Sequence, residues 1–134
     1  MKILIVEDEI AIARRMSKLL KEIDETIEVP GILGSIESAV GWLKAHAEPD
    51  LILMDIHLAD GSSFEIFNEV QVNCPVIFAT AYDQYAIQAF KVNSIDYLLK
   101  PVSKEDLAES LRKYRKYRTT STIPIDYSML AGLL

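Results

Sequence analysis

The chain has 134 residues, half of them apolar, and a formal net charge of −6 at pH 7. This length suits a single domain with its own core, and five Gly and five Pro are too few for a largely disordered chain. Residues 1–111 hold nine Lys or Arg against nineteen Asp or Glu, whereas residues 112–134 hold five against one. An acidic body repels nucleic acid, so we do not expect the body itself to bind DNA.

Three further features bear on the cellular setting. No apolar run approaches the roughly 20 residues that a membrane span needs, so no membrane contact is expected. The opening stretch MKILIVEDE has a short apolar run that ends in acids, unlike a secretory signal peptide. Cys74 is the one cysteine, which rules out an internal disulfide and favours a reducing, cytoplasmic location. Because Cys74 stands just before an apolar run, we expect a buried residue rather than a nucleophile.

The first elements alternate between strand and helix. Residues 2–6 form a short run rich in β-branched side chains, which predicts a strand. Residues 9–23 predict a helix, because apolar side chains recur at helical spacing on one face: Ile12, Met16, Leu19, Leu20 and Ile23. Residues 27–33 predict a weaker strand, placed at an edge because Pro30 lacks a backbone donor.

The alternation continues through the middle of the chain. Residues 35–47 predict a helix with Ser35 as its N-cap. A fully apolar strand follows over 51–55, and then a helix over 63–71. The next predicted strand spans 75–80.

The last predicted elements are a helix over 84–92, a strand over 95–99, and a helix over 104–117 that begins after Ser103. The remaining residues, 119–134, break the pattern. Their Ser/Thr run and proline are typical of a linker.

Five strand–helix units predict an α/β fold, in which a parallel sheet carries helices on both faces. The strands at 51–55 and 75–79 are apolar on both sides, as buried parallel strands are. In such a sheet, ligands bind outside the carboxyl ends of the strands, where the strand order reverses. Polar residues stand at four of these ends: Glu7, Asp8, Asp55, Thr80 and Lys100.

These residue types suit a phosphoryl site. Three carboxylates close together repel one another unless a cation offsets them, and Mg²⁺ prefers such oxygen ligands. Lys100 adds a positive charge and Thr80 a hydroxyl donor, which together suit a tetrahedral dianion. An aspartate in this setting can act as a nucleophile and carry a phosphoryl group as an acyl phosphate. Such transfer is catalysed mainly by positioning and charge neutralisation.

Four stretches in this order resemble the receiver domain of bacterial response regulators: ILIVEDE, LILMDIHLADGSSFEIF, PVIFATAYDQYAIQAF and DYLLKP. The resemblance covers about residues 1–118. It implies a CheY-like, flavodoxin-like (βα)5 fold with a five-stranded parallel sheet in the order 2-1-3-4-5 and helices on both faces. It further implies a signalling switch rather than an enzyme, since such a domain catalyses only its own phosphorylation and dephosphorylation.

The resemblance assigns the metal site and the acceptor. Asp55 corresponds to the phosphoacceptor, which receives its phosphoryl group from a sensor histidine kinase. Glu7 and Asp8 correspond to the acidic pocket, with Asp8 the more direct Mg²⁺ ligand. Asp55 and the backbone carbonyl of His57 complete the implied protein ligands. Glu7 replaces the more frequent Asp of the family with a longer carboxylate.

The resemblance also implies how the switch operates. Thr80 and Lys100 bind the phosphoryl oxygens, and the bond between Lys100 and Pro101 is expected to be cis. Tyr97 corresponds to the switch aromatic, which turns inward when Thr80 moves toward the phosphate. His57 and Tyr82 lie two residues beyond Asp55 and Thr80, where bulky groups shield the acyl phosphate from water. This leads to the hypothesis of a long-lived phosphorylated form.

The stretch AYDQYAIQAFKVNSIDYLLKP resembles the branch whose receivers precede a LytTR-type DNA-binding domain. We therefore expect residues 119–134 to be a linker leading to a missing output domain, through which alone the protein would contact DNA and regulate transcription. Phosphorylation is expected to remodel the face formed by the fourth helix, fifth strand and fifth helix. A second copy of the chain is the expected partner of that face, giving a homodimer.

Three other functions share parts of this pattern. A phosphatase of the haloacid dehalogenase type has an aspartate nucleophile but usually a second Asp two residues later, where His57 stands here. A flavodoxin-like FMN-binding module needs a phosphate loop rich in Ser, Thr and Gly after the first strand, where this chain has Glu-Asp-Glu. A degenerate receiver that switches without phosphate would not need the complete set of Glu7, Asp8, Asp55, Thr80 and Lys100.

Overall fold

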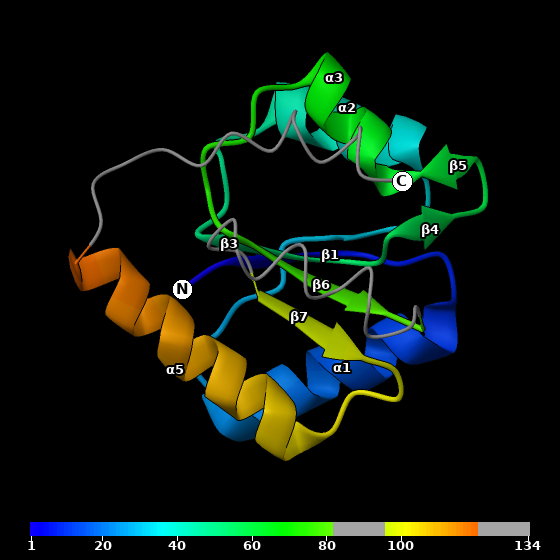
Figure 1. Ribbon diagram of the computed structural model, residues 1–134. Coiled ribbons are helices and arrows are strands. Elements are labelled where there is room, and N and C mark those ends of the chain that lie inside the picture. Colours follow the sequence, from blue (N-terminus) through cyan, green and yellow to red (C-terminus); the bar gives the residue numbers. More distant parts are fainter. Residues whose placement is uncertain (82–95, 121–134) are drawn as a thin grey trace.

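The computed structural model describes residues 1–81 and 96–120, with side chains as far as residue 116. The elements in this part of the chain, shown in Figure 1, are β1 (Ile3–Val6), α1 (Ile10–Ile23), β2 (Ile32–Leu33), α2 (Ile36–Ala45), β3 (Leu51–Met54), β4 (His57–Leu58), β5 (Gly61–Ser62), a 3-10 turn η1 (Ser63–Glu65), α3 (Ile66–Glu69), β6 (Val76–Thr80), β7 (Asp96–Leu99) and α5 (Lys104–Thr120).

Five of these strands form one parallel sheet in the order β2-β1-β3-β6-β7. Since β6 and β7 are the fourth and fifth predicted strands, the predicted order 2-1-3-4-5 is confirmed. The order reverses between β1 and β3, which are direct neighbours with Val6 paired to Met54. The residues that follow these two strands are therefore brought side by side.

Helices cover both faces of the sheet, as predicted (Figure 1). Successive strand residues point to opposite faces, so Leu4 and Val6 join the core under α2 and α3, while Ile3 and Ile5 join the core under α1 and α5. Every residue of β1 and β3 is buried, because neither face of these strands meets water.

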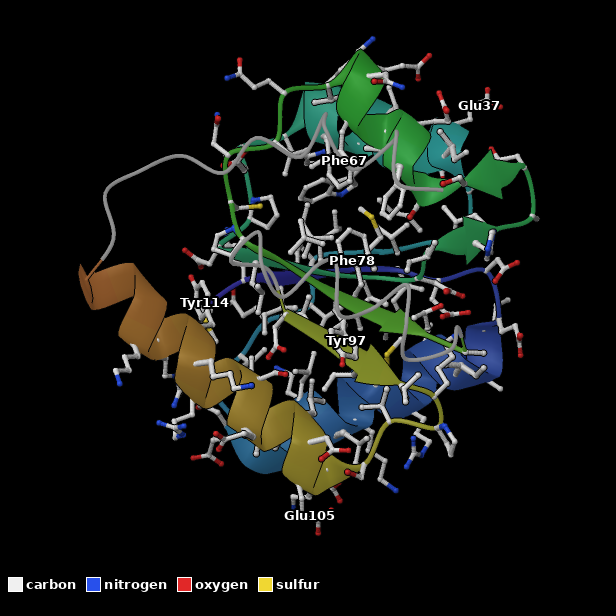
Figure 2. The ribbon with its side chains drawn as sticks, in the orientation of Figure 1. Glu37, Phe67, Phe78, Tyr97, Glu105 and Tyr114 are labelled. Atoms are coloured by element: carbon white, nitrogen blue, oxygen red, sulfur yellow. The ribbon has the colours of Figure 1, made fainter. Side chains whose placement is uncertain are left out.

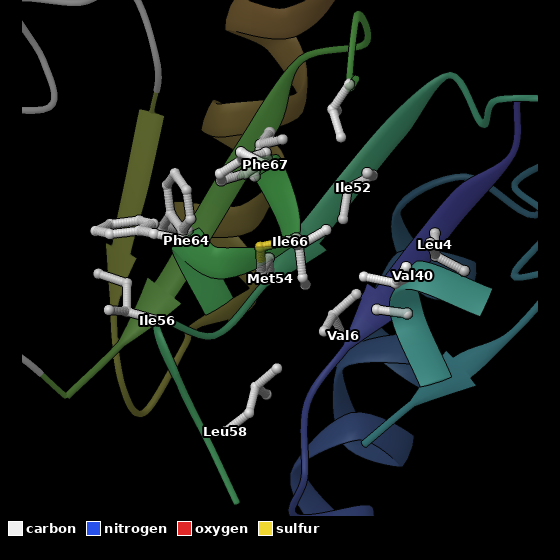
Figure 3. Packing of buried hydrophobic residues seen from close by; sticks show 14 of the residues in the cluster. Leu4, Val6, Val40, Ile52, Met54, Ile56, Leu58, Phe64, Ile66 and Phe67 are labelled. Carbon is white, nitrogen blue, oxygen red and sulfur yellow. The ribbon is translucent and has the colours of Figure 1, made fainter. Parts of the chain in front are cut away.

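The core under α2 and α3 is aromatic as well as aliphatic (Figure 3). Phe78 of β6 makes an edge-to-face contact with Phe64, with ring centroids 5.3 Å apart, and a second with Phe67 at 6.4 Å. Figure 2 shows Phe67 and Phe78 between the sheet and α3. This packing anchors the segment that follows Asp55, because Phe64 and Phe67 belong to η1 and α3.

Several predicted boundaries need correction. Of the strand predicted over 27–33, only Ile32 and Leu33 form a ladder, with one isolated bridge from Glu28 to Lys2. Pro30 lies between Glu28 and Ile32 and has no N–H to donate, which explains why the pairing breaks there. The strand lies at the sheet edge, as predicted. The helix predicted over 63–71 begins as the 3-10 turn and ends at Glu69.

The last helix in the described part of the chain ends later than predicted. Helix α5 runs to Thr120, two residues past the predicted domain end at 118. The helix predicted over 84–92, and the tail from 121 onward, lie outside the described residues. Within the described residues, no helix is both long and apolar enough to cross a membrane.

Candidate functional site

The acids after β1 and β3 meet at the predicted edge of the sheet. The Asp55 N–H donates to the Val6 carbonyl at 2.9 Å, which extends the β1–β3 ladder by one residue. Carboxylate oxygens of Glu7, Asp8 and Asp55 lie within 4.8 Å of one another. The predicted convergence of these three acids is confirmed. It follows from the direct pairing of β1 with β3.

Lys100 completes the cluster from the other side. It follows β7, and its backbone N–H donates to the Thr80 carbonyl at 2.9 Å. Its Nζ donates to Glu7 Oε2 at 2.6 Å and to Asp55 Oδ2 at 2.9 Å, forming an ion pair with each. The bond to Pro101 is cis, as the resemblance implied. One ammonium thus bridges two acids that lie 93 and 45 residues away in sequence.

Burial makes these charges interact strongly. Glu7 is 1% exposed and Asp55 8%, while Asp8 is exposed and forms the open side of the cluster. Burial raises the pKa of the Glu7 carboxyl above its ordinary value against the hydrogen bond from Lys100, and the charge of Asp55 raises it further. Burial would lower the pKa of Lys100, but its hydrogen bonds to Glu7 and Asp55, together with the charges of these two acids, outweigh burial and raise it.

The donor set fits a hard divalent cation. Three carboxylates share one ammonium, and a second cation would offset the repulsion among them. All the side-chain donors are oxygens, as Mg²⁺ requires, and the exposed Asp8 leaves one side open to water. The His57 N–H lies 3.4 Å from Asp55 Oδ1, so the His57 backbone is beside Asp55. The ligand role of the His57 carbonyl stays a prediction.

Thr80 and Tyr97 occupy the positions that the sequence predicted, on the last two strands. Thr80 ends β6 and is 1% exposed. Tyr97 pairs with Phe78 across the β6–β7 ladder, is half-buried, and packs against the core under α2 and α3 (Figure 2). Their roles as phosphate donor and switch stay predictions. Tyr82 lies outside the described residues, so the hypothesis of a long-lived phosphorylated form is untested.

Two contacts around the site were not predicted. Asp60, in the turn of the small β4–β5 hairpin, accepts hydrogen bonds from the first two N–H groups of α2. Arg15 of α1 donates from Nη1 to the Val102 carbonyl at 2.6 Å, which ties α1 to the loop after Lys100. In the sequence, the Asp-Gly pair at 60–61 indicates a turn. The sequence does not show which groups Asp60 and Arg15 bind, because both contacts join segments that are far apart in the chain.

The comparisons with known proteins agree with this geometry. Residues 3–112 match the family model described as response regulator receiver domain. The chain is similar to the sensory transduction protein LytT of Bacillus cereus, at 41% identity over 88% of this chain and 48% of that protein. It is also similar to the transcriptional regulatory protein BtsR of Salmonella typhi, at 32% identity over 92% of this chain and 52% of that protein. The chain thus spans about half the length of these curated relatives.

Among solved structures, the chain is similar to the N-terminal domain of a response regulator/sensory box/GGDEF 3-domain protein from Carboxydothermus hydrogenoformans. The TM-score is 0.72, with 30% identity over 89% of this chain and 98% of that chain. The predicted receiver is therefore confirmed over the phosphatase and flavin-binding alternatives. The chain belongs to the response regulator receiver domain family, the signalling switches of two-component systems.

Proposed function

We propose that Asp55 accepts a phosphoryl group from a sensor histidine kinase in the cytoplasm. The observation that carries this proposal is the position of the Asp55 carboxylate, within a cluster of three carboxylates and 2.9 Å from the Lys100 ammonium. An Asp55 oxygen forms the new O–P bond while the P–N bond to the kinase imidazole breaks and that nitrogen takes up a proton. Water later hydrolyses the acyl phosphate to restore the carboxylate and release inorganic phosphate.

The residues around Asp55 have separate tasks in this proposal. Lys100 holds one Asp55 oxygen and supplies positive charge beside the position of the transferred group. Thr80 offers a hydroxyl at the end of the neighbouring strand. Glu7 and Asp8, with Asp55 and the His57 carbonyl, would hold Mg²⁺. When bound, Mg²⁺ neutralises charge on the phosphoryl oxygens.

The test is direct phosphorylation. The chain is incubated with acetyl phosphate and Mg²⁺ and its intact mass is measured, with Asp55→Asn as the acceptor control and Asp50→Asn as a matched control near the other end of β3. We expect the wild type and Asp50→Asn to gain one phosphoryl group. Asp55→Asn, and wild type with EDTA in place of Mg²⁺, should gain none. An unmodified wild type, or equal modification of Asp55→Asn, would overturn the assignment.

We propose that phosphorylation draws Thr80 toward the phosphate and turns Tyr97 from its half-buried position into the interior. This would remodel the face formed by β7, α5 and the segment 82–95, whose structure is outside the described residues. A second copy of the chain is the proposed partner of that face. Sedimentation with and without beryllofluoride tests this, and an unchanged monomer would contradict it. Tyr97→Ala should retain phosphorylation and lose the dimer.

We further propose that the intact protein regulates transcription through a LytTR-type DNA-binding domain, to which residues 119–134 are the linker. Support comes from the resemblance of the receiver to that branch, from relatives about twice as long, and from one relative whose name describes a transcriptional regulator. Reading the coding sequence downstream of residue 134 tests this proposal. An output domain of another class would contradict it.

A further inference from the structure

We propose that Asp60 is a positioning residue of the phosphoacceptor site. Asp60 ties the loop after Asp55 to the start of α2. The inference rests on the proposed function, since it assigns a new residue to the same phosphoryl chemistry. Asp60 does not reach the carboxylate cluster itself. It acts by holding in place the hairpin that carries His57, and so the backbone of His57 beside Asp55.

The first link joins Asp60 to helix α2. Its Oδ1 accepts from the Ile36 N–H at 2.9 Å, and its Oδ2 accepts from the Glu37 N–H at 3.3 Å. Ser35, the N-cap residue, already accepts from the Ser38 N–H at 3.0 Å. The first three amide groups of the helix are therefore satisfied by two side chains, one local and one from 24 residues away. The Ile36 N–H in particular holds the pKa of Asp60 below its ordinary value, so its carboxylate is ionised at neutral pH.

The second link runs from Asp60 to Asp55. Asp60 lies in the two-residue turn of the β4–β5 hairpin, in which Leu58 pairs with Gly61 and His57 pairs with Ser62. The hairpin is closed at its base by the Ser63 N–H, which donates to the Ile56 carbonyl at 2.7 Å. His57, the first residue of the hairpin, has its N–H 3.4 Å from Asp55 Oδ1. The hairpin thus connects Asp60 in its turn to the His57 backbone beside the Asp55 carboxylate.

The hairpin also packs against the side chain of Ile36, in the first turn of α2. Gly61 has a φ of +134°, and a Cβ added there would lie 3.4 Å from Ile36 Cδ1. Leu58 is buried in the core under α2 and α3, with Ile36 packed against the same cluster. These contacts seat the hairpin on the first turn of α2, and the two hydrogen bonds of Asp60 fix its orientation.

The start of α2 is itself joined to the acidic pocket. Leu33, at the end of β2, accepts from the Glu7 N–H at 2.9 Å. A Cβ added at Gly34 would lie 3.7 Å from the Asp8 Cα and 3.8 Å from the Glu7 carbonyl oxygen, so this loop packs against the one after β1. Asp60 therefore connects the two loops that carry the carboxylates: the loop of Asp55 and, through α2, the loop of Glu7 and Asp8.

The experiment separates positioning from simple helix capping. Asp60→Ala removes both bonds to α2, and Asp60→Asn keeps an oxygen that can accept from the Ile36 N–H. Ser35→Ala is the matched control, because it removes a cap from the same helix without touching the hairpin. For each variant, the rate of phosphoryl incorporation from acetyl phosphate is measured across Mg²⁺ concentrations, together with the urea denaturation midpoint.

We expect Asp60→Ala to raise the Mg²⁺ concentration for half-maximal rate, or lower the maximal rate, by on the order of tenfold. Asp60→Asn should recover part of this loss. Ser35→Ala should shift the denaturation midpoint comparably and leave the phosphorylation kinetics near wild type. Equal kinetic losses in Asp60→Ala and Ser35→Ala, or no loss in either, would overturn the proposal and leave Asp60 as a helix cap only.

A second measurement needs no phosphoryl donor. Amide hydrogen exchange, read by NMR on the unphosphorylated chain, should speed up at His57 in Asp60→Ala but not in Ser35→Ala. Faster exchange confined to Ile36 and Glu37 would also overturn the proposal. If the wild type takes up no phosphoryl group, the proposed function fails, whereas exchange at His57 still decides whether Asp60 holds the loop.

Discussion

Replacing Lys100 with methionine should destabilise the metal-free domain in a pH-dependent way. The Lys100 ammonium forms ion pairs at 2.6 Å with Glu7 and at 2.9 Å with Asp55, and its side chain is 13% exposed. Methionine has a similar length but no charge. The variant therefore leaves two buried carboxylates side by side without a countercharge.

The magnitude follows from the burial of the three groups. Two unit charges 4 Å apart interact by about 4 kcal/mol at an effective dielectric constant of about 20. Removing one partner of a buried ion pair costs about 3–5 kcal/mol in other proteins. Since Lys100 retains some exposure and Glu7 can take up a proton, we expect a loss of about 2–4 kcal/mol in the free energy of unfolding at pH 8.

The pH dependence has a definite sign. The folded-state pKa of Glu7 already lies above the ordinary value of 4.5, and loss of Lys100 raises it further. At Glu7 the folded state then binds more protons than the unfolded state, so the contribution of Glu7 to stability is greatest below the ordinary pKa and falls as pH rises through the folded pKa. The penalty of the variant should therefore be smaller at pH 5 than at pH 8, by about 1 kcal/mol or more for each unit of added pKa shift.

Urea denaturation followed by circular dichroism, in EDTA at pH 5 and pH 8, measures both quantities. Lys18→Met is the matched control, because Lys18 is an exposed residue of α1 and its loss changes the net charge equally. We expect this control to shift stability by less than about 0.5 kcal/mol. A Lys100→Met variant as stable as the wild type at pH 8, or a penalty independent of pH, would refute the electrostatic reasoning.

Four further predictions concern the scaffold. Gly41→Ala should stabilise the domain by about 0.5–1 kcal/mol, because Gly41 is inside α2 and a Cβ there meets nothing within 4 Å. Gly61→Ala should instead cost about 1–3 kcal/mol, since its φ of +134° strains any residue with a Cβ; denaturation midpoints that moved in the same direction would contradict this contrast. Cys74 is 6% exposed and burial raises the pKa of its thiol, so a thiol reagent at pH 8 should label it only in denaturant, and fast labelling of the native chain would disprove its burial. Tyr114→Phe should cost about 0.5–1.5 kcal/mol, because the Tyr114 hydroxyl donates to the Asp50 carbonyl at 3.0 Å; a denaturation midpoint equal to that of the wild type would show that water replaces this bond.

The comparison of α2 with β2 shows where local sequence is sufficient. The N-cap of α2 was predicted from Ser35 at the start of the helical pattern, and the structure confirms it. The structure adds that Ser35 and Ser38 each accept a hydrogen bond from the other's backbone N–H, which makes a reciprocal capping box. The strand predicted over 27–33 was too long, because pairing at a sheet edge depends on the partner β1 as well as on side-chain preference. Local interactions can be predicted from the spacing of residues in the sequence, whereas pairing with a distant strand cannot.

The sequence by itself determined the alternation of strands and helices, the parallel sheet buried on both faces, and the positions of Glu7, Asp8, Asp55 and Lys100 at strand ends. These follow from hydrophobic periodicity and from the rule that parallel strands present their carboxyl ends at one edge. Only the tertiary structure decided that a single ammonium bridges Glu7 and Asp55, and that Asp60 caps a helix 24 residues before it. Such contacts depend on distances between segments far apart in the chain, which are set by how the helices pack on the sheet.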